Sequence, residues 1–385
     1  MKITLSSLLV MFSLYGFSST VLEEKLKEIN SIISFKKIEK IGEFKECYEI
    51  LIEQPINHEN PDEGMFLQKL YLSHRDFNQP TVLVVNGYIS YNNIVNEWSE
   101  LFNSNQIYVE HRYFGKSKPE NIVWETYKYF YPEDVSATIA LSTSVKTEAC
   151  DTSYFTYIDS LSKRNGCIKE LKNFQKQLLS ERDELIPLLK QYFDTHQKQY
   201  THLGLDNIFE NAVLEIPFSV WQNNNGCETI KNLNTQTIED IFKSLRIALH
   251  DWFLTDDILI NMNTYHYQAM TKLGYYCYPT SGLNELLKDS NKTASYIFPP
   301  ENVEVSYSKE LMIAIKQWLI SSGNHIIYIS GSNDPYSIYK ITPENNVKSL
   351  SYILQNKNHN QVRYKNIDLK QREEVLNTIN AWLNE

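Results

Sequence analysis

An aspartate and a histidine near the C-terminus could together carry out acid–base chemistry, with the aspartate first in the sequence. Asp334 follows the apolar run at 325–331, and His359 follows a second short apolar run at 350–354. A histidine can accept a proton as a general base, and a carboxylate beside it would orient the imidazole and stabilise its charged form. The alternatives are ordinary turn chemistry for Asp334, which precedes a proline, and a polar loop histidine for His359.

A nucleophile that would complete this pair is not recognisable. No serine stands within Gly-x-Ser-x-Gly. Ser117 and Ser332 are the serines closest to the inferred site, but neither follows a predicted strand and opens a helix, which is the geometry that exposes a nucleophile on a sharp turn. Both are predicted to be loop serines.

Strands and helices alternate along the parts of the chain that must position these residues. Apolar runs predict strands at 47–53, 66–74, 81–88, 106–110, 135–141, 326–331 and 350–354, and helical spacing predicts helices at 92–102, 308–320 and 369–383. From about Cys150 to Asp289 the pattern is almost wholly helical. The sequence therefore predicts an α/β fold with a large helical cap insertion, and a cap inserted there would lie over the carboxyl ends of the strands. The predicted regions are 1–20, 21–141, 142–305 and 306–385.

Composition and charge exclude several classes of partner. The chain has 385 residues and a formal net charge of −10, which disfavours nucleic acid and anionic membrane as partners. No stretch after the N-terminus is long and apolar enough to span a bilayer. Residues 1–20 combine Lys2 with an apolar run from Leu5 to Phe17, which predicts an export signal and a secreted or periplasmic protein. The alternative is a short buried helix.

Five cysteines in an exported chain predict two disulfides and one thiol. Cys150 with Cys167 is the pairing that closes the shortest loop, and the sequence leaves the connectivity of Cys47, Cys227 and Cys277 open. No cysteine pair has metal-ligand spacing and no His-Glu-x-x-His occurs, so neither a metal nor another cofactor is expected.

Several motifs resemble one known family. They are Phe66-Leu-Gln-Lys, Val84-Val-Asn-Gly-Tyr88, Val109-Glu-His-Arg-Tyr-Phe-Gly115, Phe130-Tyr-Pro-Glu-Asp-Val135, residues 213–222 and Tyr265-His-Tyr-Gln-Ala269. From about Cys47 onward the chain resembles the secreted serine tripeptidyl aminopeptidases of the α/β-hydrolase class. The resemblance implies peptide substrates that are cleaved near their N-termini, and it leaves the oligomeric state unknown.

The same resemblance implies roles for individual residues. Asp334 and His359 would be the acid and base of a catalytic triad, and Gly87 and Tyr88 would lie at the oxyanion hole, although Gly87 also suits a plain tight turn. Glu215 and Trp221 would meet the free amino group of a peptide, unless Glu215 is an incidental acid on a helical face. His111 and Arg112 are predicted to brace their loop.

The segment that should carry the nucleophile is too short. In the family, a serine within Gly-x-Ser-Lys-Gly-Gly precedes the Phe-Tyr-Pro segment. Between Glu110 and Val135 lie only residues 111–134, whereas two crossovers of about 10–12 residues each and a strand of about five would be needed. The central nucleophile strand is therefore predicted to be missing, through either an internal deletion or an incomplete gene model. The chain would be an impaired peptidase or a non-catalytic peptide-binding remnant.

Overall fold

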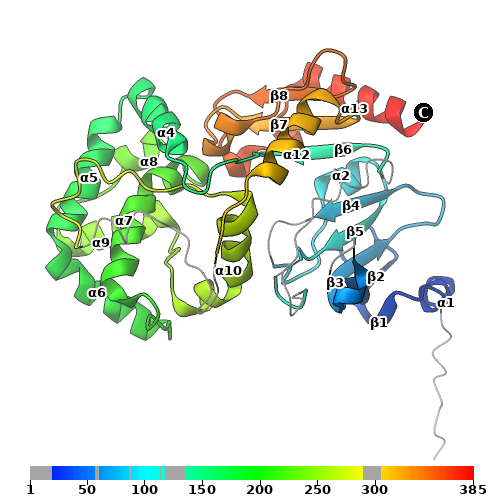
Figure 1. The fold of residues 1–385 in the computed structure, drawn as a ribbon, viewed down its shortest axis with the longest axis horizontal. Helices are drawn as coiled ribbons and strands as arrows, with labels where there is room; N and C mark the ends of the chain where they lie inside the picture. The colour runs from blue at the N-terminus through cyan, green and yellow to red at the C-terminus, as the bar shows by residue number, and fades with distance from the viewer. Residues whose placement is uncertain (1–19, 57–59, 86–88, 113, 118–134, 289–304) are drawn as a thin grey trace, which may run out of the picture. The chain divides into compact units, whose positions relative to one another are not determined.

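The computed structural model describes residues 20–56, 60–85, 89–112, 114–117, 135–288 and 305–385. The chain divides into two compact units, 1–121 and 122–385. Figure 1 shows the elements of each unit in chain order, coloured from blue at the N-terminus to red at the C-terminus.

The first unit contains a mixed sheet of five strands in the order β1-β2-β3-β5-β4. Its strands are β1 (Ile32–Ile38), β2 (Glu46–Pro55), β3 (Met65–His74), β4 (Thr81–Val85) and β5 (Asn105–Val109), and its short helices are α1 (Val21–Lys27), η1 (Pro61–Glu63) and α2 (Glu97–Leu101). The strand pairs β1–β2, β2–β3 and β3–β5 are antiparallel. Strands β4 and β5 are parallel and are connected in the sequence by α2. This confirms the β-α-β unit predicted from the sequence, with a helix shorter than expected.

The second unit contains a parallel sheet of three strands in the order β6-β7-β8. The strands are β6 (Thr138–Leu141), β7 (Ile326–Gly331) and β8 (Leu350–Leu354), followed by α13 (Leu369–Leu383), and α12 (Glu310–Ser321) precedes β7. All six residues of β7 are buried, as expected for a strand with a neighbour on each side. Strands and helices alternate in this part as the sequence predicts.

A helical region lies between β6 and α12 in the sequence. Its elements are α4 (Ser153–Arg164), α5 (Ile168–Ser180), α6 (Arg182–Thr195), α7 (Gly204–Gln222), α8 (Cys227–Lys231), α9 (Ile238–Leu249), α10 (Asp256–Gln268) and a π-helical turn, η3 (Ala269–Leu273). In α7 every residue from Ile208 to Trp221 is buried, so this helix is the centre of an aromatic-rich core. Among the described residues no helix is both long enough and apolar enough to span a membrane.

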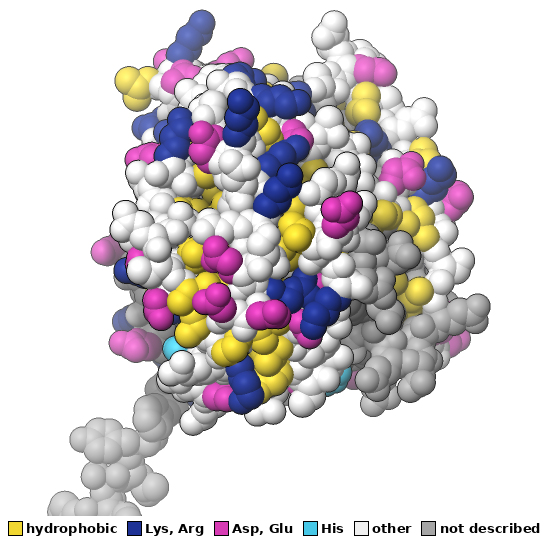
Figure 2. All heavy atoms as spheres, turned by 90° about the vertical axis from the view of Figure 1, so that its left-hand side faces the viewer, with side chains coloured by type: hydrophobic (Ala, Val, Ile, Leu, Met, Phe, Trp, Pro, Cys, Tyr) yellow, Lys and Arg dark blue, Asp and Glu magenta, His cyan; other side chains and the backbone are white. Residues whose placement is uncertain are grey.

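The outer helices of this region separate apolar and charged side chains. In α5, Leu171, Phe174 and Leu178 are buried, whereas Lys169 and Lys172 are exposed. Figure 2 shows the resulting face, on which basic and acidic side chains are interspersed and hydrophobic side chains show between them. This is the pattern of amphipathic helices with one side in a core and the other in water.

The disulfides differ from the predicted pairing of Cys150 with Cys167. Cys150 is bonded to Cys277, and Cys167 is bonded to Cys227, with Cα–Cα distances of 5.1 and 5.4 Å. The reason is the 12-residue helix α4, which lies between Cys150 and Cys167 and is about 18 Å long. The helix holds Cys150 and Cys167 apart. An isolated β-bridge between Asp151 and Tyr276 instead aligns their sequence neighbours, Cys150 and Cys277, from the two ends of the helical region. Cys47 is a buried thiol.

Candidate active site

Asp334 lies just beyond the carboxyl end of β7 and is fully buried. One carboxylate oxygen, Oδ1, accepts a hydrogen bond from the backbone N–H of Tyr336 at 3.0 Å and caps the short helix η4 (Pro335–Tyr339). The Asn-Asp-Pro sequence thus does form a turn. Because the turn uses only Oδ1, it leaves Oδ2 for a second partner.

That partner is His359, which opens the 3-10 turn η5 (His359–Gln361) after β8. Its Nδ1 lies 3.0 Å from Asp334 Oδ2, and its side chain is 34% exposed. Donation of the Nδ1 proton to the carboxylate fixes the tautomer in which Nε2 carries the lone pair, which is the form a general base needs. The convergence of Asp334 and His359 predicted from their order in the chain is confirmed by this distance.

Backbone contacts hold the two loops together. The N–H of Ser332 donates to the carbonyl of Leu354 at 2.9 Å, and the N–H of Asn333 donates to the carbonyl of Lys357 at 3.0 Å. A Cβ added to Gly331 would lie 2.1 Å from the same Lys357 oxygen. Glycine at this position therefore permits the close approach that brings aspartate and histidine within hydrogen-bonding distance.

We expect Gly331→Ala to separate these loops. The added methyl group cannot be accommodated without movement of the backbone at Lys357, which should lower the free energy of unfolding by about 1–3 kcal/mol. It should also break the hydrogen bond of His359. Urea denaturation and the NMR signal of the His359 Nδ1 proton would measure both effects. The control is Ser330→Ala, a buried neighbour at which no atom is added; an equal loss of stability in both variants would contradict the steric explanation.

The two loop serines are engaged elsewhere. Ser117 is fully buried, and its Oγ donates to Glu110 Oε2 at 2.9 Å while accepting from the N–H of Lys69 at 2.9 Å. The Oγ of Ser332 accepts from the N–H of Asn356 at 2.7 Å. Both hydroxyls form hydrogen bonds that hold their own loops in place, in agreement with their prediction as loop serines.

Glu110 explains much of the Glu-His-Arg-Tyr-Phe-Gly motif. Its fully buried carboxylate pairs with Lys69 at 2.8 Å and accepts backbone N–H groups from Ser90, Lys116 and Ser117. Gly115 has a φ of +52°, and a Cβ there would collide with this carboxylate at 2.3 Å. The motif therefore folds a loop around a buried charge.

Arg112 braces the same loop, as predicted. Its guanidinium donates to the carbonyls of Pro55 and Ile56 and lies 4.5 Å from the centre of the Phe66 ring. His111 contacts the carbonyl of Arg112 through Nδ1 at 2.6 Å. Gly87 and Tyr88, the predicted oxyanion-hole residues, lie outside the described residues.

Glu215 is a buried carboxyl group with tyrosines as its partners. It lies on α7 and is 8% exposed. The hydroxyl of Tyr278 is 3.0 Å from Oε2, and that of Tyr276 is 3.1 and 3.2 Å from the two oxygens. Burial raises the pKa of Glu215 to about 8, although the tyrosine hydrogen bonds act in the opposite direction. Such a carboxyl group gains its charge most easily when a cation binds beside it.

Trp221 does not accompany Glu215 as predicted. Its indole is 2% exposed, donates to Ser162 Oγ at 2.9 Å and packs against Gly226 in the helical core. The separation of six residues on one helix places Trp221 and Glu215 in different directions around the axis. The aromatic groups beside Glu215 are instead Tyr276 and Tyr278. The only sign of this role in the sequence is the clustering of tyrosines in Tyr-Tyr-Cys-Tyr at 275–278.

Aromatic rings connect the two candidate sites. The ring of Tyr336 lies 5.3 Å from the imidazole of His359 and 5.4 Å from the ring of Phe218. Phe218 in turn stacks on Tyr276 at 4.4 Å, and Tyr276 contacts Glu215. A carboxyl group and a general base are thus joined within one unit by three packed rings.

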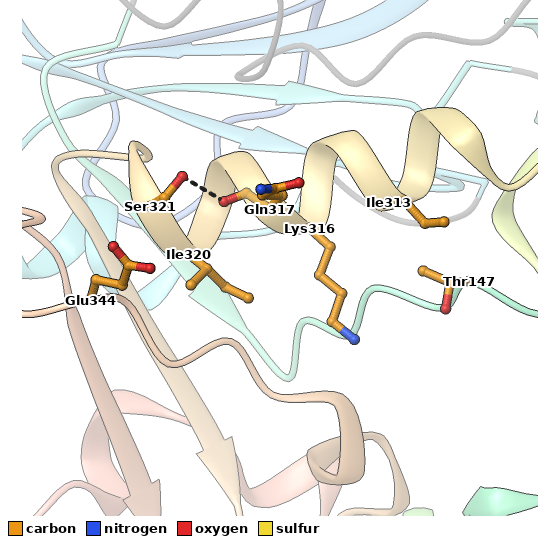
Figure 3. Close-up of a pocket in the computed structure, with 7 residues that line it drawn as sticks. All are labelled: Thr147, Ile313, Lys316, Gln317, Ile320, Ser321 and Glu344. Carbon is orange, nitrogen blue, oxygen red and sulfur yellow. Dashed lines mark hydrogen bonds between the residues drawn. The ribbon is translucent and has the colours of Figure 1, made fainter.

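Two cavities lie in the described part of the second unit. One of about 320 Å³ is lined by Thr147, Glu344 and residues of α12 that include Lys316, and Figure 3 shows the Lys316 side chain pointing away from its helix. Another, of about 260 Å³, is lined by Tyr157, Ser332 and Ser337 on the loop that carries Asp334. In the described part of the chain no cluster of His, Cys, Asp or Glu could hold a metal ion.

Comparison with known proteins identifies the class. The chain is similar to the prolyl tri/tetrapeptidyl aminopeptidase of Streptomyces mobaraensis, with 24% identity over 331 residues that cover 74% of this chain and 68% of the relative. Residues 25–128 and 122–371 match the sequence profile of PS-10 peptidase S37. The chain therefore belongs to the PS-10 peptidase S37 family of serine peptidases, and the predicted likeness to tripeptidyl aminopeptidases is confirmed.

Solved structures give a more distant likeness. Epoxide hydrolase A from Mycobacterium thermoresistibile matches with a TM-score of 0.26 and 10% identity, covering 90% of this chain and 97% of that one. A mutant of VrEH2 matches with a TM-score of 0.24 and 12% identity, covering 92% and 99%.

Proposed function

We propose that this chain is a secreted serine peptidase of the tripeptidyl aminopeptidase type that is catalytically impaired in this form. The observation that carries the proposal is the contact of His359 Nδ1 with Asp334 Oδ2 at 3.0 Å. In the proposed reaction His359 Nε2 takes the proton of a serine hydroxyl and returns it to the leaving amine, while Asp334 stabilises the imidazolium. Gly87 and Tyr88 are assigned to the oxyanion hole from the family motif alone.

The impairment follows from the missing nucleophile segment. Three observations support an interruption near residue 122. The two family matches meet at residues 122–128, and the boundary between the compact units falls at Asn121. Within the described residues, β4 and β6 are each the last strand of a sheet. In β4, Leu83 is 45% and Val85 64% exposed, which leaves apolar side chains without the cover that a strand of a parallel sheet normally has.

Glu215 is proposed to bind the free ammonium group of a peptide N-terminus. Its buried position and raised pKa make an ionised state costly when no cation is present, and a peptide ammonium would supply that cation. Tyr276 and Tyr278 would hold the carboxylate in place by their hydroxyl groups. This replaces the proposed contact with Trp221.

A fluorophosphonate probe tests the catalytic part of the proposal, because it reacts with activated serines. The purified chain should remain unlabelled, and labelling at any serine would contradict the impairment. The alternative function, a non-catalytic remnant that binds peptides, is distinguished by the genomic sequence across codons 120–130. An intact Gly-x-Ser-Lys-Gly-Gly in frame would establish a gene-model error and exclude the remnant.

Export is proposed from residues 1–20, which lie outside the described residues. The mature chain should begin near residue 20, and mass spectrometry of exported protein that still contains Met1 would contradict this.

A further inference from the structure

A buried lysine follows a strand of the sheet that carries the aspartate and histidine pair, and it has no assigned role. Lys146 is in the segment that follows β6, and it is 8% exposed. Strands β6, β7 and β8 are parallel neighbours, so the segments that carry Lys146, Asp334 and His359 all leave the sheet at its carboxyl edge. This edge is where ligands bind in open α/β sheets.

Two tyrosine rings fix the position of Lys146. Its Nζ lies 5.2 Å from the centre of the Tyr275 ring and 5.9 Å from that of Tyr336. Tyr336 also packs against the imidazole of His359 at 5.3 Å. The Tyr336 ring therefore contacts both the ammonium group and the imidazole of the proposed general base.

The Lys146 ammonium has neither a hydrogen-bond acceptor nor an ion-pair partner among the described residues. Asp151 is the acid that influences it electrostatically. The carboxylate of Asp151 is already occupied, because Oδ2 accepts from the Tyr339 hydroxyl and Oδ1 accepts from the N–H of Ser153 at 2.8 Å. The free energy gained from contact with aromatic faces offsets only part of the hydration free energy that a buried ammonium loses.

We propose that Lys146 is an anion-binding residue of the substrate site that receives a carboxylate of the bound peptide. The inference rests on the proposed function, because it assumes that peptides occupy the edge of the sheet near His359. The carboxylate would be either the C-terminal carboxylate of a short peptide or an acidic side chain. An ammonium that has no hydrogen-bond acceptor in the described part of the chain, and that shares the Tyr336 ring with His359, would then select anionic peptides.

The charge state of Lys146 agrees with this role. Burial lowers its pKa to about 8, so most molecules still carry the ammonium at neutral pH. A carboxylate that binds beside it would favour the charged form further. Because Lys146 is buried, its charge destabilises the folded protein when no ligand is bound. Binding sites commonly reduce the stability of a protein in this way.

Calorimetric binding of four kinds of peptide to the purified full chain tests the proposal. The peptides are tetraalanine, its C-terminal amide, amides with glutamate at the second, third or fourth residue, and N-acetylated tetraalanine amide. We expect tetraalanine or one of the glutamate amides to bind about 10- to 100-fold more tightly than tetraalanine amide, the range of a charge-assisted contact. Tetraalanine identifies the terminal carboxylate as the ligand, and a glutamate amide identifies the side chain.

Lys146→Met should abolish this preference and raise the temperature of unfolding, because it removes a buried charge while keeping the length of the side chain. The matched control is Lys316→Met. Lys316 also lies over a tyrosine ring, that of Tyr339 at 5.4 Å, but it extends into the cavity beside α12 (Figure 3). This control should keep the preference. Lys146→Gln serves as a second variant if the methionine variant does not fold.

The outcomes separate this inference from the proposed function. Equal binding of anionic and neutral peptides, or a preference that survives in the Lys146 variants, would overturn the anion site and leave the proposed function intact. If tetraalanine amide binds no better than its N-acetylated form, or if none of the peptides binds, recognition of peptide N-termini is contradicted and the anion site with it.

Discussion

Insertion of the strand, elbow and helix of a full-length relative between residues 121 and 122 is expected to turn this chain into an active peptidase. The measured quantity is kcat/KM for tripeptidyl chromophore substrates, and we expect a rise of about 10³- to 10⁶-fold, the range lost when a triad member is removed. The expectation depends on the pair at Asp334 and His359, which are already 3.0 Å apart. On the proposed assignment of Gly87 and Tyr88 to the oxyanion hole, the insertion supplies the serine and the second oxyanion donor.

The controls for this experiment separate chemistry from folding. The same insertion with alanine in place of its serine should fold equally well and remain inactive, and so should the inserted chain with His359→Ala. The unmodified chain should hydrolyse the substrates no faster than its own His359→Ala variant. Strong hydrolysis by the unmodified chain that is sensitive to serine inhibitors and lost on Ser117→Ala or Ser332→Ala would show that the nucleophile has been misplaced.

Local patterns predicted most of the individual elements. The run predicted at 66–74 is contained in β3, and the run at 350–354 is β8, because runs of apolar and β-branched residues that favour a strand are local in the sequence. The helix predicted at 92–102 is restricted to Glu97–Leu101. Its start is set by the Asn96 side chain, which accepts from the N–H of Trp98, a local capping choice that helical spacing alone does not reveal.

Contacts between distant residues were harder to predict. Asp334 and His359 were found because both follow strands of one parallel sheet, and the sheet fixes where strand ends meet. Cys150 was assigned the wrong partner because proximity in sequence ignores the rigid length of α4. Trp221 was assigned to the peptide site by its aromatic type, whereas its indole N–H is engaged by Ser162 within the helical core.

The second large effect is expected at Glu215. We predict that Glu215→Gln reduces the preference for a free over an acetylated peptide N-terminus by about 10- to 100-fold, since a charge-assisted contact with the ammonium becomes a neutral one. At pH 7 the unliganded carboxyl group is mostly protonated, because its pKa is about 8. An ammonium bound beside it lowers that pKa, so binding should release close to one proton. Calorimetry in buffers of different ionisation enthalpy would measure this release, which the variant should lack.

The pH dependence of the unfolding free energy of Glu215→Gln gives an independent test, because the linkage between proton binding and folding fixes its direction. In the unfolded chain Glu215 ionises near its ordinary pKa of 4.5, but in the folded chain only near 8, so the folded state binds more protons between these values and its stability falls as pH rises. Glutamine removes this loss. The excess stability of Glu215→Gln should therefore grow from pH 4.5 to pH 8, to about 4 kcal/mol. Glu170→Gln, at an exposed position on α5, should show no such trend. A constant difference across this pH range would mean that Glu215 is ionised in the folded protein without a bound cation, which would contradict its proposed role.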